Sequence, residues 1–495
     1  MKQLDVLVIG GHSLFEVGGA ETKDEMRLTY SNHQVTLDFI ENLIDSRGDL
    51  DKAEKLYQRS DKTKLFSRSL NVIYLYDFLT KHNFSVEAVN YFLYEQDKFN
   101  QLIKLKPKVV AISTTFICDA NQVVEIAKAV RKLSPESIIV AGGAKVLKSY
   151  REYQLSQDNY FEGFDVSFLN SNSFFFNNEI DKYVDAFVIE EAGESTLLEI
   201  INNIKNKQPY RHLSNIAYRK NGDLVVNKFA KEPNLSLSNI IDWEKIPESI
   251  VGQEIPIQAG IGCPFKCEFC DFAGLNIKVK LRNIDNIIAE IKNIKKRFPD
   301  RPIYFTDENL FVNSKRTKEI CRAIIESKLN IKWRSFFRAD AVNEDNVALI
   351  AESGCQEALI GVESLDDDIL KNMQKRVRSE EIQKCIYLLN QHNIKTLCTF
   401  IIGFPGETNL TINNTINSFN SIILNNRNIN RIMPFLFMPC LLSPVMKPDR
   451  RKLYKLEGSV INWSHSSMNY IEADKLLKET VKRIDNFSLV YIENT

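Results

Sequence analysis

The stretch GIGCPFKCEFCDF, residues 260–272, places Cys263, Cys267 and Cys270 within eight residues. Thiolates are soft ligands that suit zinc ions and iron–sulfur clusters. A structural zinc site needs four ligands, but the next cysteine is Cys321, so only a distant residue would complete such a site. A four-iron cluster held by three thiolates leaves one iron open, as a catalytic metal requires. The spacing therefore favours a catalytic iron–sulfur cluster and leaves a zinc site as the alternative.

Strand-like and helix-like segments alternate around this cysteine loop. Strands are predicted at IPIQAG before the cysteines and then at PIYFTDENL, KWRSFFRAD, EALIGVES and KTLCTFIIGFPGE, with helices at 283–297, 315–328, 344–353 and 379–392. About six such units predict a partial or full (β/α) barrel, in which the chemistry lies at the carboxyl ends of the strands. Besides the cysteine loop, those ends carry Asp307, Glu308, Arg338, Glu363, Ser364 and Gly403.

An earlier part of the chain has the pattern of a separate α/β domain. Apolar runs at 4–11, 109–113, 138–143 and 185–189 predict parallel strands, and helices are expected at 121–132 and 196–204. In open α/β sheets, ligands bind at the carboxyl edge of the strands. We expect a ligand there, although small residues also serve simply to make tight turns. The residues at this edge are Gly10, Gly11, His12, Ser113, Thr114, Thr115, Gly142, Gly143 and Glu194.

The predicted domain order has four parts. They are a Rossmann-like domain (1–205, with a polar insertion at 14–70), a linker (206–252), the barrel (253–428) and a small C-terminal appendage (429–495). The insertion is expected to lie over the ligand-binding edge as a lid, a recognition element or a helical decoration. Inside the linker, Asn221–Gly222 predicts a hairpin with a two-residue turn.

Composition narrows the classes of partner. Lys plus Arg and Asp plus Glu number 64 each, so the net charge is zero and no basic surface for nucleic acid or an anionic membrane is expected. No apolar run reaches the ~18 residues of a membrane span, and the first residues read as a strand rather than a signal peptide. Nine cysteines, an odd number, argue against a disulfide framework. A cytoplasmic protein is predicted.

The run CPFKCEFC, with Phe269 before its third cysteine, resembles the signature of the radical S-adenosylmethionine (SAM) superfamily. The resemblance covers about residues 255–425. It implies a [4Fe–4S] cluster on the three cysteines, whose open iron binds the amino and carboxylate groups of SAM. The reduced cluster would split SAM to give a 5′-deoxyadenosyl radical. An external electron donor such as a flavodoxin or ferredoxin is also implied.

Several strand ends resemble the family's SAM contacts. Asp307 and Glu308 stand where members carry a Gly-Gly-Glu or acidic motif for the SAM ammonium, although the two glycines are missing here. Arg338 is implied to pair with the SAM carboxylate, and Glu363, in GVESLDDDILKNMQK, with the ribose hydroxyls. FIIGFPGET is implied to border the adenine. The implied SAM set is completed by Phe269, Ser364 and Gly403.

The first domain resembles the cobalamin-binding domain that precedes one large class of radical SAM enzymes. The similar segments are PKVVAISTTF, IIVAGGAKV and DAFVIEEAGESTLLEI. Cobalamin is thus implied at the sheet edge described above. The D-x-H-x-x-G motif, whose histidine ligates cobalt, is absent, since His12 lies in GGHSLF. The lower face of cobalamin is therefore not expected to be held by that motif.

A narrower resemblance concerns the runs NVIYLYDFLTKHNFSVEAVNYF and LYKLEGSVINWSHSSMN. They are similar to the group that contains the phosphinate P-methyltransferases and the proteusin peptide epimerases, enzymes of natural-product biosynthesis. The tail matches the pattern W-S-H-x-x-M through Trp463, Ser464, His465 and Met468. Core packing and a capped turn would explain the same residues.

Three functions stay open at this point. The first is methyl transfer from methylcobalamin to an unactivated carbon or phosphorus of a small molecule or peptide. The second is peptide epimerisation from L to D, which needs a hydrogen-atom donor. Cys355, Cys398 and Cys440 are candidates, although free cysteines usually serve as small buried hydrophobes. The third is a SAM- or cobalamin-binding regulator without turnover, against which the intact cysteine motif speaks.

Overall fold

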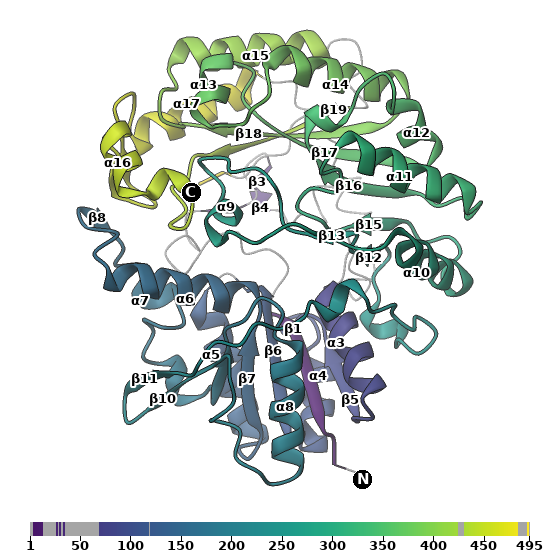
Figure 1. Ribbon diagram of the computed structural model, residues 1–495. Coiled ribbons are helices and arrows are strands. Elements are labelled where there is room, and N and C mark those ends of the chain that lie inside the picture. Colours follow the sequence, from purple (N-terminus) through teal and green to yellow (C-terminus); the bar gives the residue numbers. More distant parts are fainter. Residues whose placement is uncertain are drawn as a thin grey trace. The chain divides into compact units, whose positions relative to one another are not determined.

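The computed structural model describes residues 3–12, 69–117, 119–423 and 430–483, with short strand pieces at 26–27, 29–30, 33–34 and 493–494. The predicted insertion at 14–70 therefore lies almost wholly outside the described residues. The chain forms two compact units (Figure 1). Unit 1 comprises 1–23, 62–158 and 167–254, and unit 2 comprises 24–61, 159–166 and 255–495.

Unit 1 is built on a seven-stranded sheet in the order β11-β10-β9-β7-β6-β1-β5. The parallel strands are β1 (Val6–Gly11), β5 (Val86–Val89), β6 (Val109–Phe116), β7 (Ile138–Gly142) and β9 (Ala186–Val188). All six residues of β1 are buried, as a continuous apolar run in a covered parallel strand requires. The predicted strands and the α/β fold class are confirmed.

Helices cover both faces of this sheet. The larger ones are α3 (Leu70–Lys81), α4 (Gln96–Leu102), α5 (Ala120–Leu133), α6 (Ala144–Gln157) and α8 (Glu194–Lys205). Leu7 and Ile9 of β1 share a core with the buried face of α5. Side chains alternate along a strand, and Gly10 lies against Val72, so α3 is on the opposite face. The sheet is thus covered by helices on both faces.

The predicted hairpin extends the sheet of unit 1. It consists of β10 (Ile216–Lys220) and β11 (Asp223–Val226), and β10 pairs antiparallel with β9. Asn221 and Gly222 have φ of 55° and 92°, the left-handed conformations that a tight hairpin turn needs. The hairpin, placed in the linker by its sequence position, is thus the edge of the first sheet.

Unit 2 contains six parallel strands that follow one another in chain order. They are β12 (Ile255–Ile257), β15 (Ile303–Phe305), β16 (Trp333–Phe337), β17 (Cys355–Glu363), β18 (Lys395–Ile402) and β19 (Asn430–Leu436). In Figure 1 the connecting helices α10 (Ile284–Arg297), α11 (Ser314–Glu326), α12 (Val347–Glu352), α14 (Ser379–Gln391) and α15 (Asn409–Ile423) run along its outer side. The predicted partial (β/α)6 barrel is confirmed.

The tail is part of this second unit. Strand β19 lies beyond residue 428, the predicted end of the barrel, so the sixth strand comes from the segment expected to form the appendage. The elements that follow are α16 (Pro448–Tyr454), β20 (Glu457–Ser459), β21 (Trp463–Ser464) and α17 (Tyr470–Arg483). Helix α17 contacts β18 and β19. The boundary was misplaced because no sequence pattern separates a last strand from a decoration.

An early segment, 159–166, also belongs to unit 2. It contains β8 (Phe164–Asp165), which pairs with β20. Arg451 of α16 donates hydrogen bonds to the backbone oxygens of Glu162 at 3.0 Å and Tyr160 at 2.7 Å.

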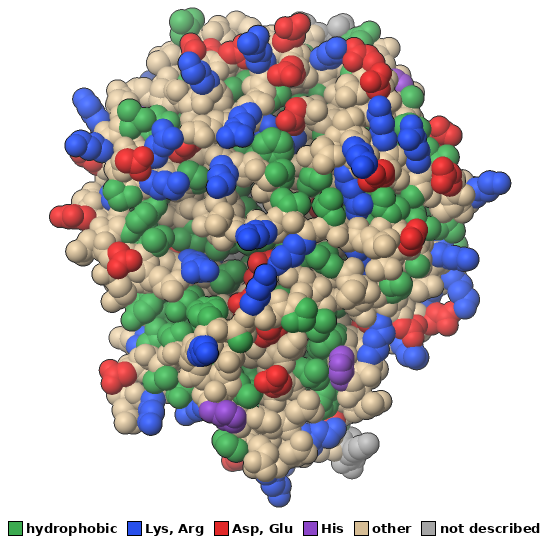
Figure 2. All heavy atoms as spheres, viewed as in Figure 1, with side chains coloured by type: hydrophobic (Ala, Val, Ile, Leu, Met, Phe, Trp, Pro, Cys, Tyr) green, Lys and Arg blue, Asp and Glu red, His purple; other side chains and the backbone are tan. Residues whose placement is uncertain are grey.

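Surface charge agrees with the composition. On the face drawn in Figure 2, Lys and Arg side chains are interspersed with Asp and Glu side chains. Among the described residues, no helix has the length and apolar content to cross a membrane.

Candidate cluster and cofactor site

The cysteine loop leaves the first strand of the barrel sheet. After β12 the chain forms β13 (Gly260–Ile261), which pairs with β14 (Lys280–Leu281), and then turns through the cysteines into α9 (Asp271–Leu275). Gly262, at φ +83°, makes this turn, and a Cβ there would lie 3.2 Å from two backbone oxygens. Local sequence thus places all three thiols on one loop at the carboxyl end of β12.

The three thiols are not disulfide-bonded, and their surroundings suit a soft metal group. Burial raises the pKa of Cys263 and raises that of Cys270 to about 11, while Arg338 and Lys375 act in the opposite direction on Cys263. Metal binding would displace these protons. In the described part of the chain, no three His, Cys, Asp or Glu side chains have the spacing of a single-ion site. The three soft donors beside two cations fit an iron–sulfur cluster.

Arg338 holds the middle of this loop. Its guanidinium carbon stacks 3.6 Å from the centroid of the Phe265 ring, and Nη1 approaches Cys267 Sγ at 3.9 Å. The other edge binds both carboxylate oxygens of Asp340, at 2.9 and 3.2 Å, and Nη2 also donates to the backbone oxygen of Lys375. The described contacts of Arg338 therefore serve the loop, whereas its pairing with the SAM carboxylate stays a prediction.

Backbone contacts fix the other half of the loop. Glu268 donates its N–H to the oxygen of Met373 at 2.9 Å, and its own oxygen accepts from Val445 N at 2.9 Å. Gly274 of α9 packs so closely on Leu442 that any Cβ would collide with the Leu442 oxygen. The segment around residues 440–446 therefore packs directly against the cysteine loop and α9.

The two acidic residues after β15 brace the entrance to the loop. Asp307 is buried and its carboxylate accepts Ala259 N at 3.0 and 3.2 Å, while burial raises its pKa to about 7. Glu308 Oε2 accepts Gly262 N at 3.0 Å. Both carboxylates therefore hold the backbone that leads to the cysteines. The sequence did not predict this role for Asp307 and Glu308. Their contact with the SAM ammonium stays a prediction.

Glu363 ends β17 in an unusual conformation. Its φ is +65°, rare for a residue with a side chain, and the ladder with β18 shifts register just before it. Its Oε1 accepts from Lys375 Nζ at 2.9 Å, and both side chains are buried. Sequence reasoning missed Lys375, although it closes the quoted GVESLDDDILKNMQK stretch. The next residue, Ser364, is fully buried and its hydroxyl serves Thr415 and Asp366 instead.

The turn after β18 is held by the tail. Gly403 has φ +95°, and a Cβ there would lie 2.7 Å from Ala473 and 2.9 Å from the Trp463 ring. His465 donates from Nε2 to the Gly403 oxygen at 2.8 Å and stacks on Trp463 with 4.9 Å between ring centroids. Glu407, buried, accepts Gly403 N, and burial raises its pKa to about 8. The W-S-H-x-x-M residues described here thus pack and cap this turn.

The three candidate hydrogen donors differ in accessibility. Cys355 and Cys398 are buried, and burial raises the pKa of Cys398 to about 12. Cys440 is partly exposed and lies in the segment that packs on α9. Among the three, only Cys440 has the exposure that a donor to a bound substrate needs.

Comparison with known proteins identifies the second unit. Residues 257–419 match the Radical SAM superfamily. The chain carries a radical SAM domain. An uncharacterized methyltransferase of Pyrococcus horikoshii is 26% identical over 245 residues, 47% of this chain and 52% of the relative. An anaerobic magnesium-protoporphyrin IX monomethyl ester cyclase of Synechocystis is 26% identical over 227 residues, 44% of this chain and 45% of the relative. The chain spans about half the length of these curated relatives.

Solved structures extend the likeness beyond the radical SAM domain. The radical SAM methyltransferase TsrM of Kitasatospora setae, solved with cobalamin and a [4Fe–4S] cluster, aligns with a TM-score of 0.60 at 14% identity, over 90% of this chain and 74% of TsrM. The cobalamin-dependent radical SAM enzyme OxsB aligns with a TM-score of 0.54 at 15% identity, over 99% of this chain and 58% of OxsB. At these identities the likeness establishes the fold of both units.

Outside the radical SAM domain, the predicted cobalamin residues at the unit 1 sheet edge behave differently. His12 is 2% exposed, stacks on Phe92 and binds Glu125 Oε2 through Nε2 at 2.8 Å. Thr114 is buried and donates to the Gly142 oxygen at 3.0 Å. Ser113 is buried beside it, whereas Thr115 and Phe116 are exposed.

The glycines of this edge contact their own chain. A Cβ on Gly10 would collide with Val72 and approach the Asn90 oxygen to 2.7 Å, and one on Gly142 would lie 3.3 Å from Val188. A Cβ on Gly143, whose φ is +112°, would lie 3.2 Å from Thr114 N, and a Cβ on Gly11 would lie 3.2 Å from the Phe116 oxygen. Internal packing therefore accounts for these glycines without a ligand. The fit to cobalamin rests on the fold and on the exposed end of β6.

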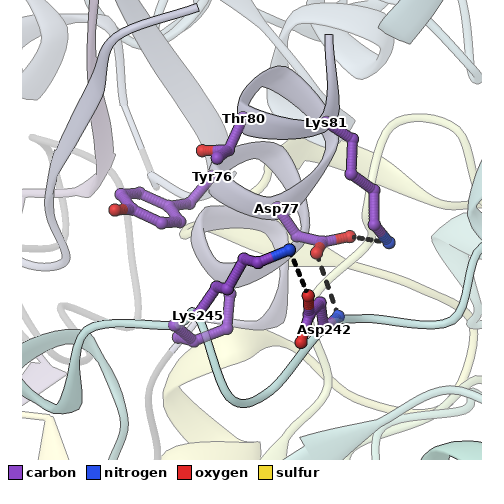
Figure 3. A pocket seen from close by; sticks show the side chains of 7 residues that line it. Tyr76, Asp77, Thr80, Lys81, Asp242 and Lys245 are labelled. Carbon is purple, nitrogen blue, oxygen red and sulfur yellow. Dashed lines mark hydrogen bonds and ion pairs between the residues drawn. The ribbon is translucent and has the colours of Figure 1, made fainter. Parts of the chain in front are cut away.

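Glu194 and a small pocket complete the picture of unit 1. Glu194 begins α8, and burial raises its pKa to about 7. A pocket of about 50 Å³ lies between α3 and the segment 242–246, and Figure 3 shows the side chains that line it. Its charges pair with each other, as Lys81 binds Asp77 at 2.7 Å and Lys245 binds Asp242 at 2.8 Å. Asp242 N donates a hydrogen bond to Asp77 Oδ1 at 3.0 Å, and this bond connects the segment to the helix.

Proposed function

We propose that this protein is a radical SAM enzyme that binds cobalamin in its first unit and transfers a methyl group to an unactivated carbon or phosphorus centre. The observation that carries the proposal is the loop with Cys263, Cys267 and Cys270 at the carboxyl end of β12, stacked and braced by Arg338. The fold shared with TsrM and the sequence similarity to the P. horikoshii relative, both named methyltransferases, favour methyl transfer over other radical reactions.

The residues divide the work as follows. The three cysteines would hold the cluster, and Glu308 after β15 and Glu363 at the end of β17 would accept hydrogen bonds from SAM. When bound, the cluster and SAM supply a 5′-deoxyadenosyl radical, and cobalamin carries the methyl group. Arg338 keeps the loop in place, and the Gly403 turn, fixed by the tail, would border the adenine. Electrons would come from outside the chain, from a flavodoxin or ferredoxin, and the substrate would be a small molecule or a peptide.

Anaerobic reconstitution tests the proposal. The purified protein should bind about one four-iron cluster, as soft thiolate ligands of this kind do. With a reductant it should convert SAM to 5′-deoxyadenosine, and the visible spectrum should show bound cobalamin. The deuterated methyl group of labelled SAM should then appear in the product. A protein that cleaves SAM but binds no cobalamin would contradict the methyl-transfer part alone.

Peptide epimerisation is the second candidate, favoured by the position of Cys440. This thiol is partly exposed on the segment that contacts α9 and the cysteine loop. In that reaction one solvent deuterium should enter the peptide at Cα, and Cys440→Ala should stop turnover while SAM cleavage continues. Deuterium at Cα without methyl incorporation would replace the first candidate by this one.

A further inference from the structure

The Glu363–Lys375 pair is a buried charge pair at the carboxyl end of a barrel strand. The exposed fractions of the two side chains are 9% and 6%, and the ammonium lies 2.9 Å from Oε1. The second oxygen, Oε2, accepts a hydrogen bond from Thr399 at 3.3 Å. A buried carboxylate without a charged partner takes up a proton and loses acceptor capacity. The Lys375 ammonium is the charged partner that the buried Glu363 carboxylate needs.

Gly361 leaves the space in which this pair lies. A Cβ at this position would stand 2.5 Å from Glu363 Oε1 and 3.0 Å from Lys375 Nζ. Gly361 has no left-handed φ, so its missing side chain, and not its backbone conformation, is what the pair requires. The strand is therefore shaped around the pair, and the left-handed φ of Glu363 adds a second departure from regular structure. Such departures cost stability, and they are found preferentially at active sites and ligand-binding positions.

Lys375 is itself fixed by the cysteine loop. Its backbone oxygen accepts a hydrogen bond from Arg338. Its ammonium lies 5.6 Å from the ring centroid of Phe269, a residue between the second and third cysteines in the sequence. The preceding turn binds the loop through Met373, whose oxygen accepts Glu268 N. One short segment thus contacts both the loop and the Glu363 carboxylate.

We propose that Lys375 is a positioning residue that holds the Glu363 carboxylate in the orientation that binds the ribose diol of SAM, in the space that Gly361 provides. The inference rests on the proposed function, because it presumes that SAM binds here. A carboxylate has about four lone-pair positions, and the contacts above occupy two of them. The remaining positions suit two adjacent hydroxyl groups. Lys375 acts through Glu363 and does not itself bind the amino-acid end of SAM.

Two variants and one matched control separate this role from others. Lys375→Met removes the charge but keeps the length, and Gly361→Ala displaces the pair without changing any charge. Lys371→Met makes the same change at an exposed lysine one turn earlier. Each reconstituted protein would be titrated anaerobically with SAM and with 5′-methylthioadenosine, which keeps the adenine and ribose but lacks the amino-acid end. Iron content and thermal unfolding would show that cluster and fold are retained.

The expected result is a loss of affinity of roughly ten- to hundredfold for both ligands in Lys375→Met and Gly361→Ala, with no change in Lys371→Met. Loss of SAM affinity alone, with 5′-methylthioadenosine unaffected, would mean that Lys375 binds the carboxylate of SAM directly and would overturn the proposal. Unchanged affinity for both ligands would overturn it as well. A wild-type protein that holds its cluster but binds no SAM would instead refute the proposed function.

Discussion

The two parallel sheets of this protein use their carboxyl edges differently. In the radical SAM domain, Asp307 and Glu308 follow β15 and Arg338 follows β16, and all three contact the segment from residue 259 to the cysteine loop. In unit 1, Gly10 and His12 contact neighbouring elements of their own fold. Convergence of side chains from several strands on one loop points to a bound group more strongly than a row of small residues does. Four predictions test this contrast.

The largest effect is expected from the cysteines. Replacing Cys263, Cys267 and Cys270 by Ala should abolish cluster binding, because no other thiol lies on this loop. Iron and sulfide analysis after anaerobic reconstitution measures the result. Cys321→Ala, at a buried thiol of α11, is the control and should keep full iron content. Iron retained in the triple variant would remove the basis of the comparison.

A second prediction concerns the pH dependence of stability. Glu407 has a pKa of about 8 in the folded protein against an ordinary 4.5, so the folded state binds the extra proton. Its contribution is therefore complete below pH 4.5 and is lost as pH rises through 8, by up to about 1.4 kcal/mol per unit. Denaturant unfolding should show that Glu407→Gln loses less stability than the wild type over this window. If the free energies of unfolding of the two proteins changed in parallel with pH, the pKa of Glu407 would not be raised by burial.

A third prediction addresses the bracing of the loop. Arg338→Gln should lower the free energy of unfolding by about 2–3 kcal/mol, because Asp340 and the loop lose a charged, buried partner. It should also slow cluster reconstitution, followed by the visible absorbance. Arg334→Gln is the control for general loss of charge, because Arg334 is a half-buried arginine within β16. Equal reconstitution rates in both variants would contradict the claim that Arg338 braces the cysteine loop.

The smallest effects are expected in unit 1, where they sharpen the contrast. Gly10→Ala should cost about 1–3 kcal/mol through overpacking against Val72, and any loss of cobalamin would accompany this loss of stability. Thr115→Ala, at an exposed side chain, should change stability by less than about 0.5 kcal/mol. Cobalamin titration of both variants measures the difference. Weaker binding in the stable Thr115→Ala variant would locate the cofactor at the end of β6, and full binding would locate it elsewhere.

Most of the fold could be predicted from local sequence patterns. The apolar runs, the Asn221–Gly222 turn and the cysteine spacing each depend on a few consecutive residues, so they could be read directly. The charge pairs could not, because Lys375 finds Glu363 only through the geometry of β17 and the turn after it. The position of the sixth strand was not predicted for a related reason, since β19 has an ordinary sequence and acquires its place by pairing with β18.

The candidate site shows the same limit in another form. A glycine in sequence does not reveal what it makes room for. Gly403 faces Trp463, Gly361 faces the Glu363 pair and Gly10 faces Val72, and only the first two involve the radical SAM domain. Polar residues were equally ambiguous, since Ser364 turned out to cap a turn. Their partners lie far away in the chain, and sequence periodicity carries no information about them.

The pairing of β8 with β20 has a consequence for folding during synthesis on the ribosome. Arg451 meets the oxygens of Glu162 and Tyr160 across separations of 289 and 291 residues. Ribosomes add about 5–20 residues per second, so the segment 159–166 waits roughly 15–60 s for its partners. Unit 1 has its whole sequence available long before then, while this segment must remain unpaired. Helix α16 and strand β20 therefore complete a contact with a segment that was synthesised about 290 residues earlier.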